Sequence, residues 1–183
     1  MRKIIYSMGV SLDGYIAGPG GDIDWGVPDE ELHRFHNERV REVGAHFCGR
    51  RLYETMLYWE TTDPSAGPIE AEFAGIWQAL PKIVFSTTLE SVEGNWRLAT
   101  GSIADEVAAL REQPGKDIGV GGAGLAAAFI ELGLIDEYEL FVYPVVIGAG
   151  TPFFPPLKER LDLELVETRT FGSRVEHLRY RQA

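Results

Sequence analysis

Short apolar segments that alternate with helix-like segments are the feature that most constrains this chain. "KIIYSMGVS" (3–11), "AHFCG" (45–49), "KIVFST" (82–87) and "DIGVG" (117–121) each predict a strand, and helical periodicity or capping signals lie between them. Strands that are joined through helices form parallel sheets with helices on both faces. The order therefore predicts an α/β fold with three layers, α/β/α, around a mixed, mostly parallel sheet.

The C-terminal part of the chain predicts a change of strand direction. "DEYELFVYPVVIG" (136–148) predicts a long, central apolar strand with a local bulge at Pro144, since proline cannot donate a ladder hydrogen bond. The segments 161–171 and 173–182 alternate between apolar and polar residues around Gly172 and Ser173. That alternation predicts an antiparallel hairpin at the C-terminus.

Helix boundaries follow from periodicity and from capping residues. The segment "DEELHRFHNERVREV" (29–43) predicts a helix that turns Val43 inward and stops at Gly44. Ser102 and Asp105 form a capping-box pattern at the start of another helix. Further helices are expected from Arg50, over 69–79 and over 123–132, with a loop over 59–68.

Length and charge limit the possible partners. The 183 residues are expected to form one domain, 1–183. The net charge of −11 repels nucleic acid and anionic lipid, and no apolar run approaches the roughly 20 residues of a membrane span. The single cysteine, Cys48, permits no internal disulfide, which favours a cytoplasmic location. We therefore expect neither a nucleic acid nor a membrane as a partner.

The stretch "IGVGGAGLAAAF" (118–129) contains a glycine-rich turn between a strand and a helix. Gly119, Gly121 and Gly124 match the G-x-G-x-x-G spacing of dinucleotide-binding turns. The turn lies too late in the chain for a Rossmann unit, and the acids that follow it, from Asp136, open the next strand instead of closing it. The geometry argues against a Rossmann site. Two interpretations remain: a site that binds phosphate, or a glycine turn that only lets the strand and the helix pack closely.

Two more strand ends carry residues that suit a phosphate. Arg50 and Arg51 begin a helix, where cations oppose the helix dipole, so that helix stability does not explain them. They are either phosphate ligands or solvated and ion-paired arginines. Ser86, Thr87 and Thr88 follow the next strand and are either ligand contacts or turn residues. Since these groups share the C-terminal edge of a parallel sheet, together they predict a nucleotide site.

Other combinations of residues give weaker hypotheses. His33 and His36 share a helix face with Glu30, but no cluster with metal-ligand spacing accompanies them, and no metal is expected. Cys48 lies within an apolar strand and is expected in the core.

With these pieces in order, the chain resembles the dihydrofolate reductase superfamily. It is more similar to the reductase domain of the riboflavin-pathway deaminase-reductase and to its stand-alone relatives. The resemblance covers nearly the whole chain and rests on motifs that occur in the family's order: "VSLDGYIAG", "DW" at 24–25, "GRRLYE", "KIVFST", "GVGGAGL" and "GLIDEYELFVYPVVIGAGTPFF".

The resemblance implies an NADPH-dependent reductase that transfers a hydride to a C=N or C=O bond of a small heterocyclic or sugar-linked substrate. It also implies a homodimer. The residues that would bind the cofactor are Val10, Ile16 and Ala17 at the nicotinamide, Arg50 and Arg51 at the 2'-phosphate and pyrophosphate, Ser86 and Thr87 at the adenosine, and Gly121, Gly122, Ala123, Gly124 and Leu125 around the pyrophosphate and ribose. Leu52 stands where many members have threonine, which removes one phosphate hydroxyl.

The substrate side is implied by alignment on Trp25 and Pro28. That alignment places Glu30 where dihydrofolate reductases carry the carboxylate that contacts the pterin, although first-turn acids also stabilise a helix dipole. Trp25 is expected as a cleft wall, Asp13 as a structural loop residue and Asp24 in the same loop. The ribosylamino-pyrimidine of riboflavin synthesis, 5-amino-6-(5-phosphoribosylamino)uracil, is one candidate substrate. A dihydrofolate or pterin reductase and a non-catalytic nucleotide-binding module are alternatives.

Overall fold

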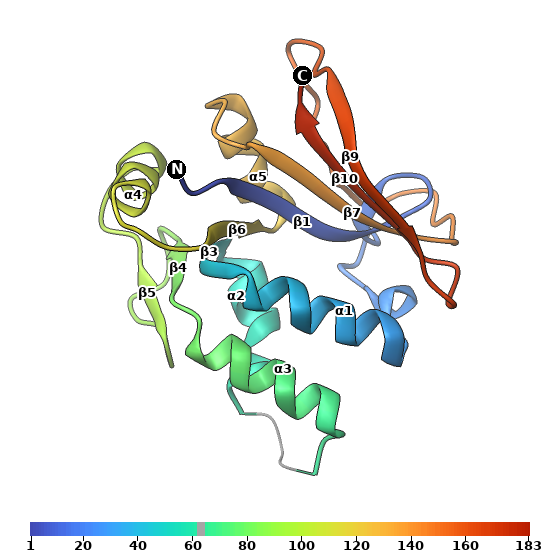
Figure 1. Ribbon diagram of the computed structural model, residues 1–183. Coiled ribbons are helices and arrows are strands. Elements are labelled where there is room, and N and C mark those ends of the chain that lie inside the picture. The colour runs from blue at the N-terminus through green and yellow to red at the C-terminus, as the bar shows by residue number, and fades with distance from the viewer. Residues whose placement is uncertain (62–64) are drawn as a thin grey trace.

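The computed structural model describes residues 1–61 and 65–183, and its centre is an eight-stranded sheet (Figure 1). The strand order is β5-β4-β3-β6-β1-β7-β10-β9. All neighbouring pairs from β5 to β7 are parallel, and β10 pairs antiparallel with both β7 and β9. The strands are β1 (Ile4–Ser11), β3 (Val43–Gly49), β4 (Lys82–Phe85), β5 (Trp96–Leu98), β6 (Asp117–Gly121), β7 (Glu137–Tyr143), β9 (Leu163–Thr170) and β10 (Glu176–Gln182).

Helices cover both faces of this sheet, which confirms the predicted three layers (Figure 1). One face packs against α4 (Ile103–Arg111) and α5 (Ala123–Glu131), where Tyr6 of β1 and Phe129 of α5 share a buried cluster. The other face carries α1 (Glu30–Arg41), α2 (Arg50–Met56) and α3 (Pro68–Ala79), and Trp77 of α3 packs in a second cluster with Cys48. Cys48 therefore lies in the core, as expected.

Two predicted boundaries were wrong, and both errors have a local cause. The first helix ends at Arg41, and Gly44 lies inside β3 at a register shift between Val43 and Ala45. A Cβ at Gly44 would lie 3.2 Å from the backbone nitrogen of Lys116. The glycine therefore allows a bulged strand to pass close to its neighbour instead of stopping the helix.

Pro144 ends a strand instead of bulging one. β7 stops at Tyr143, and the N–H of Val145 donates to the carbonyl of Tyr143 at 2.8 Å, so that the chain turns at the proline. Before that turn β7 lies between β1 and β10, as an inner strand of the sheet.

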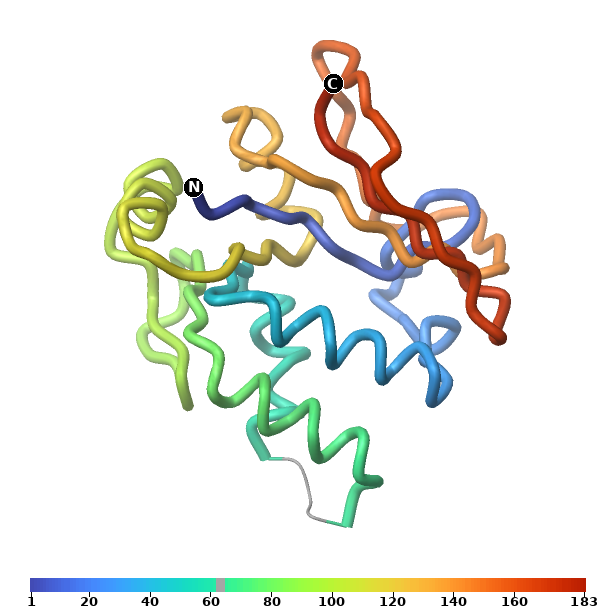
Figure 2. The backbone as a smooth tube through the Cα atoms, viewed as in Figure 1, coloured from blue at the N-terminus to red at the C-terminus, as the bar shows by residue number. Residues whose placement is uncertain are grey.

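The C-terminal hairpin is confirmed, and a small second sheet lies beside the first. Figure 2 shows the hairpin of β9 and β10 beside β7. The small sheet pairs β2 (Tyr15–Ala17) with β8 (Thr151–Pro152). The capping box of Ser102 and Asp105 is confirmed as well. Short 3-10 turns cover Asp24–Gly26 and Leu57–Glu60, and part of the predicted loop, 62–64, lies outside the described residues. Across residues 1–61 and 65–183, none of the helices is both long and apolar enough to cross a membrane.

Candidate active site

Four neighbouring strands end side by side at the edge where the candidate site lies. β4, β3, β6 and β1 are adjacent and parallel, with Phe85 opposite Gly49 and Cys48 opposite Gly121. Their C-terminal ends therefore bring residues 86–88, Arg50 and the glycine turn into one row. Ligands bind α/β sheets at this edge, in particular where the chain order reverses.

A hollow of about 530 Å³ lies at the outer end of this row. Arg50, Ser86, Thr87 and Thr88 line it. The guanidinium of Arg50 donates to the hydroxyl of Thr88 at 2.8 Å, and it also donates to the carboxylate of Glu54 at 2.6 Å. Arg50 and the hydroxyl groups of residues 86–88 therefore lie together at the ends of two strands, as the sequence predicted. The Arg50 guanidinium is already bonded to Glu54 in its own helix.

The two alternatives for these residues both find partial support. Ser86 accepts hydrogen bonds from the N–H groups of Thr88 and Leu89, so its hydroxyl also organises the turn. Arg51 is exposed, and no ion pair is found for its side chain among the described residues. The hollow therefore combines turn residues with the guanidinium of Arg50, and the exposed Arg51 follows in the same helix turn without lining the hollow.

The glycine turn leads into α5 without a side-chain cap. Gly122 has a φ of 87°, a left-handed conformation that side chains disfavour. The first N–H groups of a helix have no acceptor within the helix. Here the N–H of Gly122 donates to Met8 Sδ at 3.5 Å, and among the described residues no side chain accepts from the next three N–H groups, 123–125. Leu52 lies directly over Gly121, where it fills the space that a Cβ would occupy. The turn can present N–H groups to an anion, and Leu52 closes its inner side.

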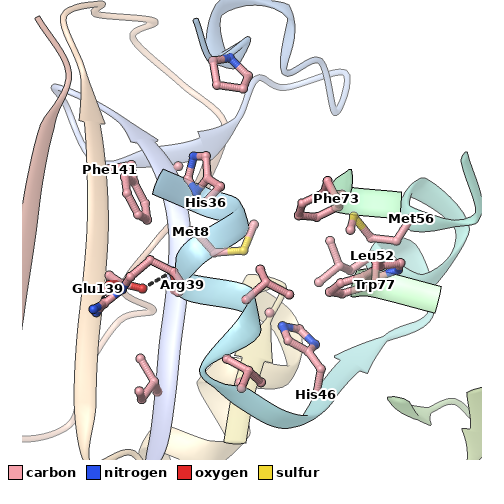
Figure 3. Close-up of a pocket in the computed structure, with 18 of the residues that line it drawn as sticks. Met8, His36, Arg39, His46, Leu52, Met56, Phe73, Trp77, Glu139 and Phe141 are labelled. Carbon is pink, nitrogen blue, oxygen red and sulfur yellow. Dashed lines mark hydrogen bonds and ion pairs between the residues drawn. The ribbon is translucent and has the colours of Figure 1, made fainter. Parts of the chain in front are cut away.

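A larger cavity of about 870 Å³ lies between the sheet and helices α1, α2 and α3. Figure 3 shows Phe141 and His36 on one side of it and Phe73, Met56 and Trp77 on the other. Part of its floor is glycine backbone, because Gly9, Gly119 and Gly121 present no side chain there. The cavity reaches the glycine turn at Gly121, so it adjoins the row of strand ends.

The histidines of the cavity are held in the neutral form. Burial lowers the pKa of His36 to about 4, against the opposing charge of Glu139. Burial lowers the pKa of His46 to about 4 as well, and the charge of Lys82 acts in the same direction. The pKa of His33 is also lowered by burial. These three imidazoles therefore add no positive charge to the cavity at neutral pH.

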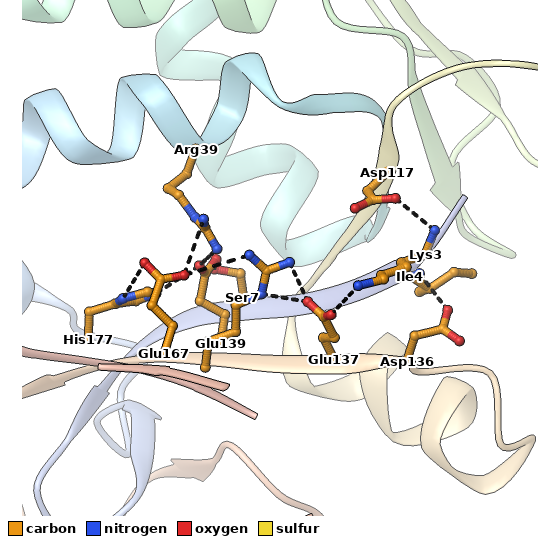
Figure 4. Close-up of polar contacts among 11 residues, drawn as sticks. Lys3, Ile4, Ser7, Arg39, Asp117, Asp136, Glu137, Glu139, Glu167 and His177 are labelled. Carbon is orange, nitrogen blue, oxygen red and sulfur yellow. Dashed lines mark hydrogen bonds and ion pairs between the residues drawn. The ribbon is translucent and has the colours of Figure 1, made fainter. Parts of the chain in front are cut away.

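A network of buried charges forms one end of the cavity (Figure 4). Glu139 lies among Arg39, His177 and Ser7, with His177 Nε2 at 2.8 Å and Ser7 Oγ at 2.8 Å from its oxygens. Burial raises the pKa of Glu139, but the His177 hydrogen bond and the Arg39 charge outweigh it and bring the pKa to about 2. The Glu139 carboxylate is ionised and fully engaged.

The family assignment follows from the extent of the sequence match. The description "RibD C-terminal domain" belongs to the family that matches residues 2–176, nearly the whole chain. The chain belongs to this family.

Two relatives match the chain over nearly its full length. YyaP, an uncharacterized protein of Bacillus subtilis (strain 168), is 35% identical over 182 residues, which cover 98% of this chain and 94% of YyaP. YwjB, an uncharacterized protein of the same organism, is 30% identical over 178 residues, which cover 96% of this chain and 95% of YwjB.

Solved structures share the fold. A protein of Shewanella sp. PV-4 named for riboflavin biosynthesis has a TM-score of 0.80 at 24% identity, over 100% of this chain and 99% of that chain. A Thermotoga maritima diaminohydroxyphosphoribosylaminopyrimidine deaminase/5-amino-6-(5-phosphoribosylamino)uracil reductase has a TM-score of 0.71 at 17% identity. That match covers 100% of this chain and 57% of the two-activity protein. The fold is thus that of RibD reductase domains.

The substrate residues expected from the sequence do not gather in the cavity. Glu30 is exposed at the start of α1, where its carboxylate accepts from Arg34 at 2.6 Å. Trp25 packs edge-on against Tyr143 at 5.7 Å, and Asp24 is exposed in the turn before it. Asp13 accepts from the N–H of Gly148 at 2.7 Å, a contact that suits a structural loop residue. Glu30, Asp24, Asp13 and Trp25 are absent from the residues that line the cavity.

The residues expected near the nicotinamide lie on two strands. The side chain of Val10 is 1% exposed and points into the core, so only its backbone can face a ligand. Ile16 and Ala17 are half-buried on β2, which pairs with β8. Gly150 permits that pairing, because a Cβ there would collide with the carbonyl of Ala17.

Several residues that line the cavity were not predicted from the sequence as site residues. Met8, Phe73, Trp77 and Phe141 line the cavity, and so do His33 and His36, which the sequence suggested only as a disfavoured metal pair. Within the described ranges, no group of three or more potential metal ligands is found. A usable signal is the alternation of Gly119 and Gly121 on one face of β6, which lets His46 and Leu52 pack directly on the sheet at the edge of the cavity.

Proposed function

We propose that this chain is an NADPH-dependent reductase that transfers a hydride to a C=N or C=O bond of a small ring or sugar-linked substrate. The observation that carries the proposal is the row of four strand ends. It begins at the hollow of Arg50 and residues 86–88, passes the uncapped start of α5 and ends beside the cavity. An extended dinucleotide needs such a sequence of subsites.

The residues present fit this cofactor. Arg50, Arg51 and Thr88 would hold the 2'-phosphate, because guanidiniums form strong, charge-assisted hydrogen bonds with phosphate oxygens. The N–H groups of Ala123, Gly124 and Leu125 would hold the pyrophosphate at the helix start. A Cβ on Gly124 would meet nothing within 4 Å, so that a ligand can approach the backbone there.

Bound NADPH would supply the hydride, and the chain would supply position and exclusion of water. Met8, Leu52 and Met56 line the cavity near the glycine turn and offer no hydrogen bond to water. The carbonyl or imine carbon of a substrate would enter between the cavity walls at His36 and Phe73, because Leu52 covers the glycine backbone at Gly121. The role of the protein is then orientation of two bound molecules in a largely apolar space.

Direct titration tests the proposal. We expect NADPH to quench the fluorescence of Trp59 or Trp77, which line the cavity, with a dissociation constant below tens of micromolar. We expect NADH to bind more weakly, because it lacks the 2'-phosphate. NADPH binding without oxidation across a panel of pterins, pyrimidines and aldehydes would instead favour a non-catalytic nucleotide-binding module. Absence of NADPH binding would reject the proposal.

The Glu30→Gln variant tests the substrate carboxylate that the family resemblance implies. Because Glu30 is exposed and bonded to Arg34, we expect kcat and KM to change by less than about twofold. Glu31→Gln, a neighbouring exposed acid bonded to Arg169, is the matched control. A fall in kcat of about tenfold or more for Glu30→Gln alone would assign the proton delivery or substrate contact to Glu30 after all.

A further inference from the structure

Two pairs of rings form part of the inner walls of the large cavity. His36 packs on Phe141 with ring centroids 4.3 Å apart, and Phe73 lies nearly parallel to Trp77 at 6.0 Å and 12°. Figure 3 shows these two groups facing each other across the cavity. Opposed rings and methionine side chains favour a planar ring between them.

Every cation among the described residues that line this cavity is already paired. Arg39 bonds to Glu139 and lies 3.8 Å from Glu167. Arg179 bonds to Glu137 and lies 3.9 Å from Glu167. Lys116 donates to the carbonyl of Arg41 at 2.5 Å and lies 3.4 Å from Glu42. Drawing one of the two arginines toward a substrate anion would remove a close counter-charge from the buried carboxylate of Glu139 or Glu137, which is costly.

Acids outnumber cations along the same lining. The lining residues include three cations and four carboxylates, and the lining histidines are neutral. The cations are Arg39, Lys116 and Arg179, and the carboxylates are Glu42, Glu70, Asp117 and Glu139. The start of α1, next to the lining residue Pro28, holds three further acids, 29–31, of which Glu30 is paired with Arg34 and Glu31 with Arg169. A phosphate in this cavity would therefore meet net negative charge without an uncommitted cation among the described lining residues.

The contrast with the hollow at Arg50 separates two kinds of ligand. That hollow offers the guanidinium of Arg50 and three hydroxyls, whereas the cavity offers rings, methionines and paired charges. We propose that the cavity takes a flat, uncharged ring compound that carries no phosphate, so that the substrate of this chain differs from a phosphoribosyl pyrimidine. The inference rests on the proposed reductase function and specifies its substrate class.

Matched pairs of ligands test the inference by calorimetry. The first pair is 5-amino-6-(5-phosphoribosylamino)uracil and its phosphate-free ribosyl form, and the second is 1,4-naphthoquinone and its 2-sulfonate. We expect the uncharged member of each pair to bind at least about tenfold more tightly, which corresponds to about 1.4 kcal/mol. Equal or tighter binding of the anionic member in either pair would overturn the inference, and so would the absence of binding by both uncharged members.

The titrations are made with and without saturating NADP⁺. Failure of NADP⁺ and NADPH to bind would reject the proposed function. The ligand pairs, titrated into the free protein, would still test whether the cavity prefers uncharged ligands. Measurements on the wild type therefore distinguish failure of the proposed reductase function from failure of the inferred substrate class.

A single added cation tests whether charge causes the preference for uncharged over anionic ligands. Thr55 lines the cavity and is exposed, so that Thr55→Lys introduces a charge without opening the core. Thr55→Gln, an uncharged polar substitution, is the matched control. We expect Thr55→Lys to bind the phosphorylated or sulfonated members at least about threefold more tightly than Thr55→Gln does, with the uncharged members unchanged. No difference between the two variants would reject charge as the reason.

Discussion

The Arg50→Gln/Arg51→Gln double variant is expected to bind NADPH about 100-fold more weakly than the wild type while binding NADH nearly as before. Each guanidinium would contribute a hydrogen bond to a charged oxygen, which is worth about 1.5–3 kcal/mol, and two such contacts amount to a hundredfold or more. The 2'-phosphate is the part of NADPH that NADH lacks, so the loss should be specific. Dissociation constants for both cofactors at fixed ionic strength measure it.

A second double variant controls for net charge. Arg34→Gln/Arg160→Gln removes two exposed, ion-paired arginines that do not line the hollow, and we expect both cofactors to bind it as they bind the wild type. The fold should survive in both proteins, because the ion pair of Arg50 with Glu54 is exposed and contributes only a few tenths of a kcal/mol. An equal loss for NADPH and NADH would contradict a 2'-phosphate role for the arginine pair.

The layers and the row of strand ends could be predicted from the sequence because they depend on local patterns. Apolar runs, capping residues and glycine turns act within a few residues, and right-handed parallel connections then place the strand ends together. These patterns alone assign Arg50 to the same sheet edge as Ser86 and Thr87, and in the folded chain the three residues line one hollow.

The walls of the cavity could not be predicted in the same way, because they depend on packing between distant elements. Phe141 of β7 and Trp77 of α3 line the same cavity, although they lie far apart in the chain. The role of Glu30 stays a prediction, since alignment on two neighbouring residues cannot tell which way a helix side chain points, and in the structure its carboxylate accepts from Arg34. Gly44 was predicted as a helix stop, whereas long-range contact with the segment at Lys116 decides its conformation.

Glu139 illustrates how a tertiary network overrides a local pattern. In the sequence it is one of the acids, from Asp136 on, that open an apolar strand. In the structure its side chain is 5% exposed and contacts Arg39, His177 and Ser7. An ionised carboxylate is stable at that depth only because those partners replace the water that it loses.

The Glu139→Gln variant is therefore expected to lose about 3–5 kcal/mol of unfolding free energy, since it leaves the largely buried Arg39 without its main counter-charge. Urea denaturation at about pH 7 measures the loss. Glu164→Gln breaks the ion pair with Arg181, in which both side chains are 57% exposed, and is expected to cost less than about 1 kcal/mol. Similar losses in the two variants would contradict a special role for burial.

The pH dependence of the stability difference between the wild type and Glu139→Gln shows whether the difference comes from the charge of Glu139. The pKa of Glu139 in the folded protein is about 2, below the ordinary value of 4.5, so that the unfolded chain takes up the proton first as the pH falls. The stabilisation is therefore complete above about pH 4.5 and declines as the pH falls toward about 2. Glutamine at this position cannot titrate. The gap in unfolding free energy between wild type and Glu139→Gln should thus narrow as the pH falls from about 4.5 toward about 2, whereas a gap that stays constant would assign the loss to packing instead of charge.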